Sequence, residues 1–412
     1  MSKSISQPGF STLEATEAKL ETTSNNIMVL LIDDQAIVAE AVKKMLENEK
    51  DIQLTYCNDP TKALQVAFKI KPTVILQDLV MPDVDGLTMV KFFRANPSTK
   101  NVPMIVLSSR EEPDIKSQAF SLGANDYIVK LPDKLELIAR IRYHSKAYIN
   151  LIERNEAFEA LVASQTALKA ELKEAENYVR SLLPEKLNTE LFKTDWVFTS
   201  STDLGGDAFG YHWLDEDHFA IYLLDVCGHG VGAALLSVSA INVLRAQSLP
   251  EVDFLDPASV LKGMNETFKM EEQNQMYFTF WYGVYNKQTR ELVYASGGHP
   301  PAILISNNKI IKLSTPGMVI GGFRDISFTS AKINIQPDDR LYIFSDGVYE
   351  LDYDNQNRMM TLDDFAQELL KPPANNKTKV QSMVEFSSKA QASEYFSDDY
   401  SLVEIIFNPP PS

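Results

Sequence analysis

Polar side chains directly follow four of the apolar runs in the first third of the chain: Asp33 with Asp34, Asp78, Ser108 and Lys130. Because the carboxyl ends of parallel strands share one edge of a sheet, we expect these side chains to converge in one crevice. Three carboxylates so close together repel one another, and a cation such as Mg²⁺, which prefers carboxylate and phosphate oxygens, relieves that repulsion. A carboxylate placed there can also attack phosphorus and form an aspartyl phosphate. Lys130 and Ser108 would then stabilise the phosphoryl oxygens.

A second set of acidic residues is spread over the other half of the chain: Asp207, Asp225, Asp346, and the adjacent pair Asp398 and Asp399. Each ends or flanks an apolar strand, with glycines nearby where the backbone must approach something closely. Scattered carboxylates suit Mg²⁺ or Mn²⁺ better than zinc. Two such ions about 3.5–4 Å apart can activate water for an in-line displacement at phosphorus. The pattern predicts hydrolysis of a phosphate ester, although an isolated Asp-Gly pair is more often a turn.

The first acidic set requires a parallel sheet. Short apolar runs alternate with helix-like segments from residue 27 to about 135. The runs are 27–32, 52–56, 74–76, 103–107 and 126–129, and the helical segments between them are 36–46, 61–68, 86–93 and 115–122. This alternation predicts a doubly wound five-stranded parallel sheet.

A long segment without Gly or Pro follows, from Lys134 to Leu183. Its large residues alternate spacings of three and four, which is the seam of a coiled coil. The downstream part of this heptad seam consists of Phe158, Leu161, Gln165, Leu168, Leu172, Ala175, Val179 and Leu182. The upstream part, from Ile138 to Asn155, joins it with a three-residue step, a stammer that overwinds a supercoil. We expect a coiled-coil homodimer over 138–183; the alternative is a single amphipathic helix packed on its own domain.

From Trp196 onward, strands follow one another without crossover helices. Strands are predicted at 219–225, 277–286, 291–295, 303–305, 341–344 and 401–407, and helices at 231–245, 257–269 and 363–370. This order predicts an antiparallel β-sandwich flanked by helices, an α+β arrangement.

Composition limits the partners. The 412 residues carry a formal net charge of −17, which opposes nucleic acid and anionic membrane surfaces. The two cysteines, Cys57 and Cys227, stand far apart, and no stretch is long and apolar enough to span a membrane. We expect a cytoplasmic protein that binds neither nucleic acid nor membranes. Residues 1–26 contain almost no large aliphatics, which predicts a disordered tail.

The first acidic set resembles the response regulator receiver domain over residues 27–145. The matching residues are Asp33-Asp34, Asp78 to Pro82 with Gly86, Ser108-Ser109 and Tyr127 to Lys130. The resemblance implies that Asp78 accepts the phosphoryl group, that Asp33, Asp34 and Asp78 hold Mg²⁺, and that Ser108, Tyr127 and Lys130 are switch residues. A sensor histidine kinase or phosphotransfer protein would be the partner. One departure is Leu131, since the family usually has proline directly after the lysine and a cis peptide there.

The second set resembles the bacterial branch of the metal-dependent protein Ser/Thr phosphatases (PPM), which includes sporulation and stress-module enzymes, over residues 185–408. The matching segments are 205–207, 225–236, 296–300, 317–322, 344–350 and 398–401. The resemblance implies that Asp225 bridges two Mn²⁺ or Mg²⁺ ions, that Asp207 and the Val226 carbonyl serve one ion, and that Asp346 and Asp398 serve the other. Asp399 replaces Asp398 if the last motif is shifted by one residue.

Three further residues bear on this second resemblance. Gly210 stands where the family often has an aspartate, and no arginine stands near the motifs as a phosphate clamp, so orientation must come from the metals and the protein partner. His229 and His299 could serve as acid or base groups. We favour structural roles for both.

The resemblances predict a phosphatase controlled by aspartyl phosphorylation. They point to a phosphorylated STAS-type anti-sigma antagonist as substrate, in a partner-switching pathway. The alternative is a non-catalytic adaptor that binds an anti-sigma or sigma-factor partner through a phosphatase-like domain. Retention of Asp207, Asp225, Asp346 and Asp398 favours the enzyme. No basic recognition helix follows the receiver, which argues against a transcription factor.

Overall fold

The computed structural model describes residues 26–82, 84–109, 112–201, 204–353, 358–373, 376–391 and 396–409. The tail predicted for residues 1–26 lies, except for Asn26, outside the described residues. The chain divides into two compact units, Met1–Ser164 and Gln165–Ser412. None of the helices in the described part combines the length and hydropathy that a membrane span requires.

Five parallel strands form the sheet of the N-terminal unit, in the order β2-β1-β3-β4-β5. The strands are β1 (Ile27–Ile32), β2 (Ile52–Cys57), β3 (Val74–Asp78), β4 (Met104–Ser108) and β5 (Asp126–Val129). The connecting helices are α2 (Ala36–Leu46), the 3₁₀ turn η1 (Pro60–Lys62) with α3 (Ala63–Ile70), α4 (Gly86–Ala95) and α5 (Pro113–Ser121). Every residue of β3 and β4 is buried, as expected of strands covered on both faces. The predicted doubly wound fold is confirmed.

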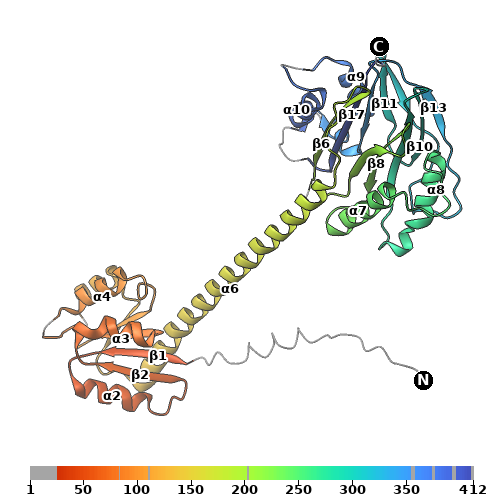
Figure 1. Cartoon of the computed structure of the whole chain (residues 1–412). Coiled ribbons are helices and arrows are strands. Elements are labelled where there is room, and N and C mark those ends of the chain that lie inside the picture. Colours follow the sequence, from red (N-terminus) through yellow and green to blue (C-terminus); the bar gives the residue numbers. More distant parts are fainter. Residues whose placement is uncertain are drawn as a thin grey trace, which may run out of the picture. The chain divides into compact units, whose positions relative to one another are not determined.

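Helices cover both faces of this sheet (Figure 1). One core packs α3, α4 and α5 against residues such as Leu30, Ile75 and Val106. The other core packs α2 and the start of α6 (Lys134–Ser181) against Val29 and Leu76. Alternate residues of each strand therefore serve opposite cores.

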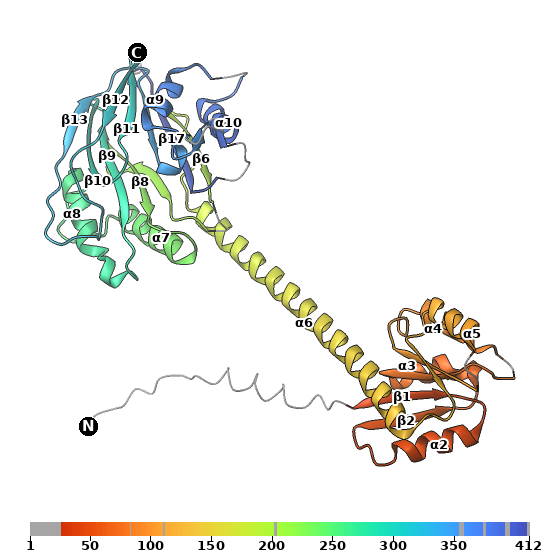
Figure 2. The same ribbon diagram turned by 180° about the vertical axis from the view of Figure 1, so that it is seen from behind.

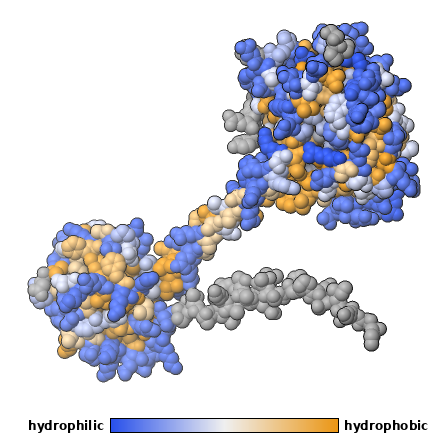
Figure 3. Space-filling model, in the orientation of Figure 1, coloured by the Kyte–Doolittle hydropathy of each residue, from blue (hydrophilic) through white to orange (hydrophobic). Residues whose placement is uncertain are grey.

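Helix α6 is one continuous helix of 48 residues. Its first turns belong to the N-terminal unit: Leu137, Ile138 and Ile141 are buried there, and the Ser145 hydroxyl lies 3.1 Å from that of Thr73. The start of the upstream seam, including Ile138 and Ile141, thus packs on its own unit, whereas its last positions, Ile152 and Asn155, are exposed. From residue 152 to 171 every residue is exposed, and hydrophobic side chains lie among hydrophilic ones along this stretch (Figure 3).

Two five-stranded antiparallel sheets form the C-terminal unit. The first has the order β13-β10-β9-β8-β7, with β7 (Ala208–Trp213), β8 (His218–Val226), β9 (Phe278–Asn286), β10 (Glu291–Gly297) and β13 (Ala331–Asn334). The second has the order β12-β11-β14-β17-β6, with β6 (Phe192–Thr199), β11 (Ala302–Ser306), β12 (Lys309–Leu313), β14 (Arg340–Phe344) and β17 (Tyr400–Phe407). A two-stranded ribbon pairs β15 (Asp352–Tyr353) with β16 (Arg358–Met359).

Helices flank this sandwich on both sides (Figure 2). Helices α7 (Val231–Arg245) and α8 (Pro257–Thr267) pack on the outer face of the first sheet, and η2 (Met270–Glu272) follows α8. Helices α9 (Leu362–Leu370) and α10 (Lys379–Gln391) pack on the outer face of the second sheet, and η3 (Asp346–Val348) follows β14. A third core, which includes Trp281 and Leu341, fills the space between the sheets. The predicted helix-flanked antiparallel sandwich is confirmed.

Candidate functional site

The strand ends of the N-terminal sheet bring the first acidic set together. Asp33 follows β1 and Asp78 ends β3, and the Lys130 ammonium group forms an ion pair of 2.8 Å with each of them. Asp33, Asp34 and Asp78 have carboxylate oxygens within 4.8 Å of one another. Asp33 and Asp78 are fully buried. The sheet edge therefore holds three carboxylates and one ammonium group in a single crevice.

This crevice has more negative charge than its own lysine neutralises. Burial raises the pKa of Asp78 above its usual value, Lys130 opposes this rise, and the charge of Asp33 adds to it. One oxygen of Asp34, Oδ1, is buried and has no hydrogen-bond partner among the described residues. An unpartnered carboxylate oxygen beside two other carboxylates fits the ligand set that Mg²⁺ prefers.

The other predicted residues of the N-terminal unit line the same edge of the sheet or lie close to it. Ser108 ends β4 and is buried. Tyr127 on β5 has its ring buried, and the Lys116 ammonium lies 5.6 Å from the ring centre. Leu131 is exposed, and no peptide bond of the described residues is cis.

Gly86 explains the loop beside Asp78. A Cβ at Gly86 would lie 2.5 Å from both the Asp78 carbonyl oxygen and the Leu79 Cα. Only glycine allows the first residue of α4 to approach the end of β3 so closely. The Asp85 side chain caps this helix by accepting a hydrogen bond from the Thr88 backbone N–H at 3.1 Å.

The second acidic set comes from both sheets of the C-terminal unit. Asp207 precedes β7, Asp225 lies near the end of β8, Asp346 begins η3 after β14, and Asp398 lies two residues before β17. Asp207 is buried, Asp225 and Asp346 are half-buried, and Asp398 is exposed. Hydrogen bonds join the two segments of the second sheet, because the Ser345 hydroxyl donates to the Asp399 carbonyl at 3.0 Å and accepts from the Ser401 N–H at 3.1 Å.

Asp398 and Asp399 have different environments. The buried Asp399 carboxylate accepts hydrogen bonds from the Ser201 N–H at 2.9 Å and the Gly206 N–H at 2.7 Å. It holds the turn that carries Asp207 against the start of β17. A Cβ at Gly206 would lie 2.8 Å from the Val226 carbonyl oxygen, so this turn also faces the end of β8. Asp398 is exposed, and its carboxylate accepts a hydrogen bond from the Asp399 N–H at 2.7 Å.

The carboxylates of this set raise one another's pKa. Burial, with the charges of Asp346 and Asp398, raises the pKa of Asp225 to about 8. Burial, with Asp398 and Glu350, raises the pKa of Asp346 to about 6. Burial and the charge of Asp225 also raise the pKa of Asp207 well above its usual value. The four side chains therefore act as one electrostatic cluster.

Among the described residues no cation balances this cluster, in contrast with the N-terminal crevice. Within the described part of the chain, no Lys or Arg forms an ion pair with any of its four carboxylates. Both oxygens of the Asp207 carboxylate are buried without a hydrogen-bond partner among the same residues. Buried, uncompensated carboxylates are costly unless a cation binds them. The donor set consists of oxygens and fits Mg²⁺ or Mn²⁺.

The structure also shows the surroundings of Gly210, His299 and His229. A Cβ at Gly210 would lie 2.5 Å from the ring of Tyr222, so this ring fills the space beside the glycine. His299 is buried, and burial lowers its pKa to about 4. Its Nδ1 lies 2.8 Å from the Pro300 carbonyl oxygen, which gives the ring a structural contact. His229 is exposed in the glycine-rich turn after β8.

Sequence reasoning missed the residues that hold the second cluster in place. Ser201, Ser345 and Ser401 make the hydrogen bonds to the Asp399 segment. The signal available was weak: Ser345 precedes an Asp-Gly pair and Ser401 follows an Asp-Asp pair by one residue. Serine is too common in turns for that spacing to identify a contact across about 200 residues.

Two families of known proteins match this chain. Residues 29–142 match the response regulator receiver domain, and residues 215–408 match Stage II sporulation protein E (SpoIIE). The phosphoserine phosphatase RsbP of Bacillus subtilis is 29% identical over 189 residues, which are 44% of this chain and 46% of RsbP. The phosphoserine phosphatase RsbU of the same organism is 30% identical over 195 residues, which are 46% of this chain and 57% of RsbU. The chain thus spans about half the length of these relatives.

The solved structure of the SiaA-PP2C domain of Pseudomonas aeruginosa has the same fold as the C-terminal unit. It aligns with a TM-score of 0.52 and 18% sequence identity, over 60% of this chain and 99% of that domain. At this identity the likeness shows the fold alone.

Proposed function

Because this chain joins a response regulator receiver domain to a PPM-type phosphatase domain homologous to RsbP and RsbU, we propose that it is a metal-dependent protein serine/threonine phosphatase whose activity the receiver controls. The observation that carries the proposal is the Asp207 carboxylate: it is buried, the charge of Asp225 acts on it, and neither of its oxygens has a geometrically acceptable hydrogen-bond partner among the described residues. A folded protein keeps such a group when a ligand binds it.

In this proposal Asp207, Asp225, the Val226 carbonyl, Asp346 and Asp398 would together hold two Mn²⁺ or Mg²⁺ ions. When bound, such ions supply a water of lowered pKa and stabilise the phosphoryl oxygens. The chain's own contribution is to fix the ligands. Asp399 holds the Asp207 turn by its hydrogen bonds to Ser201 and Gly206, and leaves Asp398 free to face solvent.

The receiver supplies the input. An Asp78 oxygen attacks the phosphorus of a phosphohistidine on a sensor kinase or phosphotransfer protein, and the phosphorus–nitrogen bond of the donor breaks as the aspartyl phosphate forms. Lys130, already 2.8 Å from Asp78, is placed to contact a phosphoryl oxygen there. Asp33, Asp34 and Asp78 would hold the Mg²⁺ that this transfer requires.

The substrate we propose is a phosphorylated STAS-type anti-sigma antagonist in a partner-switching pathway, as the homology to RsbP and RsbU supports. These partners are cytoplasmic, so the proposal places this protein in the cytoplasm. A homodimer through the heptad seam of α6 would connect receiver and phosphatase. Its support is the exposed stretch 152–171, where the large apolar seam residues Phe158, Leu161 and Leu168 are 65%, 55% and 56% exposed.

The test is dephosphorylation of purified phospho-STAS proteins with Mn²⁺, with and without beryllofluoride, which mimics the aspartyl phosphate. We expect Mn²⁺-dependent release of phosphate at a rate that beryllofluoride changes. A chain that binds the STAS protein but releases no phosphate from it or from p-nitrophenyl phosphate would instead be the non-catalytic adaptor.

A further inference from the structure

Exposed apolar side chains gather around the strand end that carries Asp225. Five of them form what we call the apolar rim: Val231, Leu235, Tyr277, Met318 and Phe323. Leu235 and Phe323 are the most exposed of the five, at 62% and 54%.

Backbone contacts attach the rim to the end of β8. Val231 and Leu235 lie one turn apart on α7, the helix that starts five residues after Val226. The backbone of Tyr277 pairs with that of Cys227 at 2.9 Å.

The other two rim residues, Met318 and Phe323, belong to a segment one strand spacing further from β8. Phe278 is the register partner of Val226, and it exchanges two backbone hydrogen bonds with Ile320. Met318 and Phe323 flank Ile320 in the chain. Two strand spacings separate Val226 from Ile320, which is roughly 10 Å.

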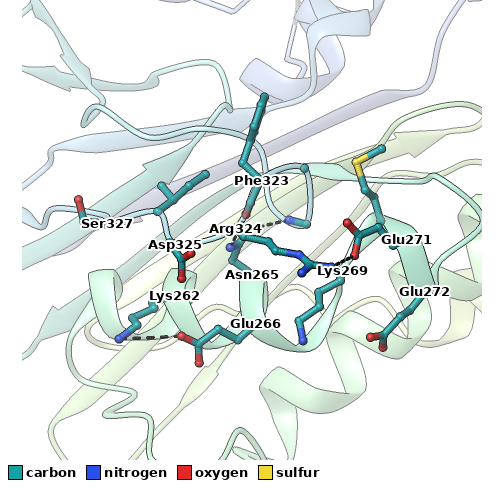
Figure 4. A pocket seen from close by; sticks show the side chains of 14 residues that line it. Lys262, Asn265, Glu266, Lys269, Glu271, Glu272, Phe323, Arg324, Asp325 and Ser327 are labelled. Carbon is teal, nitrogen blue, oxygen red and sulfur yellow. Dashed lines mark hydrogen bonds and ion pairs between the residues drawn. The ribbon is translucent and has the colours of Figure 1, made fainter.

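A groove continues the rim beyond Ile320. It has a volume of about 810 Å³ and lies between the end of α8, η2 and the segment 321–327 (Figure 4). Its lining carries four carboxylates and three cationic side chains, so it is polar and slightly acidic. Two ion pairs, Lys262 with Glu266 and Arg324 with Glu271, neutralise part of this charge.

The segment that bears Phe323 is held in place. Asn265 of α8 is buried, and its side-chain amide donates to the Phe323 carbonyl at 3.0 Å and accepts from the Gly321 N–H at 2.7 Å. The backbone at Gly321 and Phe323 is therefore fixed before a partner binds. This lowers the entropic cost of a contact made by the Phe323 ring.

We propose that the apolar rim and the groove together dock the folded phosphoprotein whose phosphoserine is hydrolysed at the Asp225 cluster. The inference rests on the proposed function and adds the surface that selects the substrate. A protein held at that cluster must cover an interface of ~800 Å² on each partner, a patch that extends beyond roughly 10 Å from its centre. The backbone of Ile320, close in the chain to Met318 and Phe323, lies at about that distance, and the Tyr277 backbone pairs with the residue after Val226, so a protein substrate of this size reaches these parts of the rim.

Electrostatics supports a protein occupant of this kind. Within the described part of the chain, no Lys or Arg forms an ion pair with the carboxylates of the cluster, so contacts outside the cluster contribute to positioning the phosphoserine. The groove lining has one more carboxylate than cationic side chains, so it slightly favours a partner surface with basic residues beside an apolar patch. Aromatic side chains such as Phe323 are enriched in protein interfaces.

The experiment compares three substrates of the full-length protein with Mn²⁺: a folded phospho-STAS protein, a short phosphoserine peptide from it, and p-nitrophenyl phosphate. The variants are Phe323→Ser and Leu235→Ser, and the matched control is Leu255→Ser, an exposed apolar residue (39%) just before the other end of α8. We expect kcat/KM for the folded protein to fall at least ~10-fold in both variants. The peptide and the aryl phosphate, which have no surface to dock, should stay within about 2-fold.

Each other outcome overturns the docking surface. Variants that lose no more activity on the folded protein than Leu255→Ser show that the rim is not used. A wild-type protein that hydrolyses the folded protein no faster than the peptide would also show that the rim is not used. If that protein still hydrolyses p-nitrophenyl phosphate, the proposed metal cluster is not affected by this result. Loss of self-association in the variants, seen by sedimentation, assigns the rim to a second copy of the chain. A wild-type protein inactive on all three substrates overturns the proposed function together with this surface.

Discussion

At the scale of single residues, the two acidic sites differ in how their charge is balanced. Lys130 forms ion pairs with Asp33 and Asp78, whereas the cluster around Asp225 has only carboxylates. The chain itself therefore partly neutralises the first site, whereas the described residues leave the second with uncompensated carboxylates. Asp346, Asp78 and the neighbours Asp398 and Asp399 test this difference.

Asp346 is the first of these residues. Replacing it with Asn removes one negative charge from the second cluster and weakens cation binding, so Mn²⁺-dependent hydrolysis of p-nitrophenyl phosphate should fall by on the order of 100-fold. The control is Asp363→Asn, whose side chain is 77% exposed and pairs only with Lys312. A folded Asp346→Asn protein with wild-type activity would remove Asp346 from the site.

Asp78 is the second. Acetyl phosphate with Mg²⁺ should label the protein in an acid-stable, base-labile manner, because Asp78 is the carboxylate beside Lys130 at the end of β3. Asp78→Ala should take up no label, while Asp85→Ala, at the N-cap of α4, should be labelled like the wild type. Equal labelling of the Asp78 variant would place the phosphoacceptor elsewhere.

Asp399 and Asp398 form the third. Asp399→Ala leaves the buried N–H groups of Ser201 and Gly206 without their acceptor, which should lower the free energy of unfolding by about 2–4 kcal/mol. Asp398→Ala removes an exposed carboxylate from a repulsive cluster and should not destabilise the metal-free protein. Urea unfolding in EDTA measures both. Equal destabilisation by the two substitutions would contradict the separate roles of these neighbours.

At the scale of elements, α6 is the feature to test. Its first turns are held by the N-terminal unit, where Arg140 forms an ion pair with Asp126 at 2.7 Å and Arg142 pairs with Asp51 at 2.8 Å. Every residue of its middle, from 152 to 171, is exposed. An insertion in this stretch rotates one end of the helix relative to the other about the helix axis. It does not disturb the hydrophobic core of either unit.

An insertion of two residues after Gln165 tests whether α6 transmits the input. It turns the downstream seam by about 200° on an α-helix, which separates the two parts of the stripe. Basal hydrolysis of an aryl phosphate should survive, while its dependence on beryllofluoride should be lost or inverted. An insertion of seven residues nearly restores the phase and should keep the dependence. Regulation that persists after the two-residue insertion would rule out transmission through the helix phase.

At the scale of the whole molecule, the seam predicts a homodimer. The charge of −17 opposes association, so the apolar residues of the exposed stretch must supply the attraction. The double variant Leu161→Glu/Leu168→Glu places charge in that seam and should convert a dimer to a monomer in sedimentation equilibrium. Glu159→Lys/Lys169→Glu, which changes exposed polar positions outside the seam, is the control. A wild-type protein that sediments as a monomer with and without beryllofluoride would contradict the dimer.

The sequence by itself determined the features that depend on neighbouring residues. The strands of the N-terminal sheet, the bounds of α2 and α7, and the continuous helix from Lys134 all follow from local periodicity and from the positions of Gly and Pro. The positions of Asp33 and Asp78 also followed, since strand ends in a parallel sheet always meet at one edge. Sequence reasoning missed α10 and the strands β6, β7, β12 and β13, all four of which lie at sheet edges, where pairing rather than pattern decides the structure.

Only the tertiary structure decided which neighbour does what. Asp398 and Asp399 are chemically identical and adjacent, and their roles separate only because Gly206, 193 positions earlier in the chain, donates a hydrogen bond to Asp399. Likewise, Ile138 and Ile141 carry the same heptad pattern as Leu161, yet a sheet of their own unit covers them. Burial and hydrogen bonding across such separations depend on how distant segments pack, and local sequence carries no record of that packing.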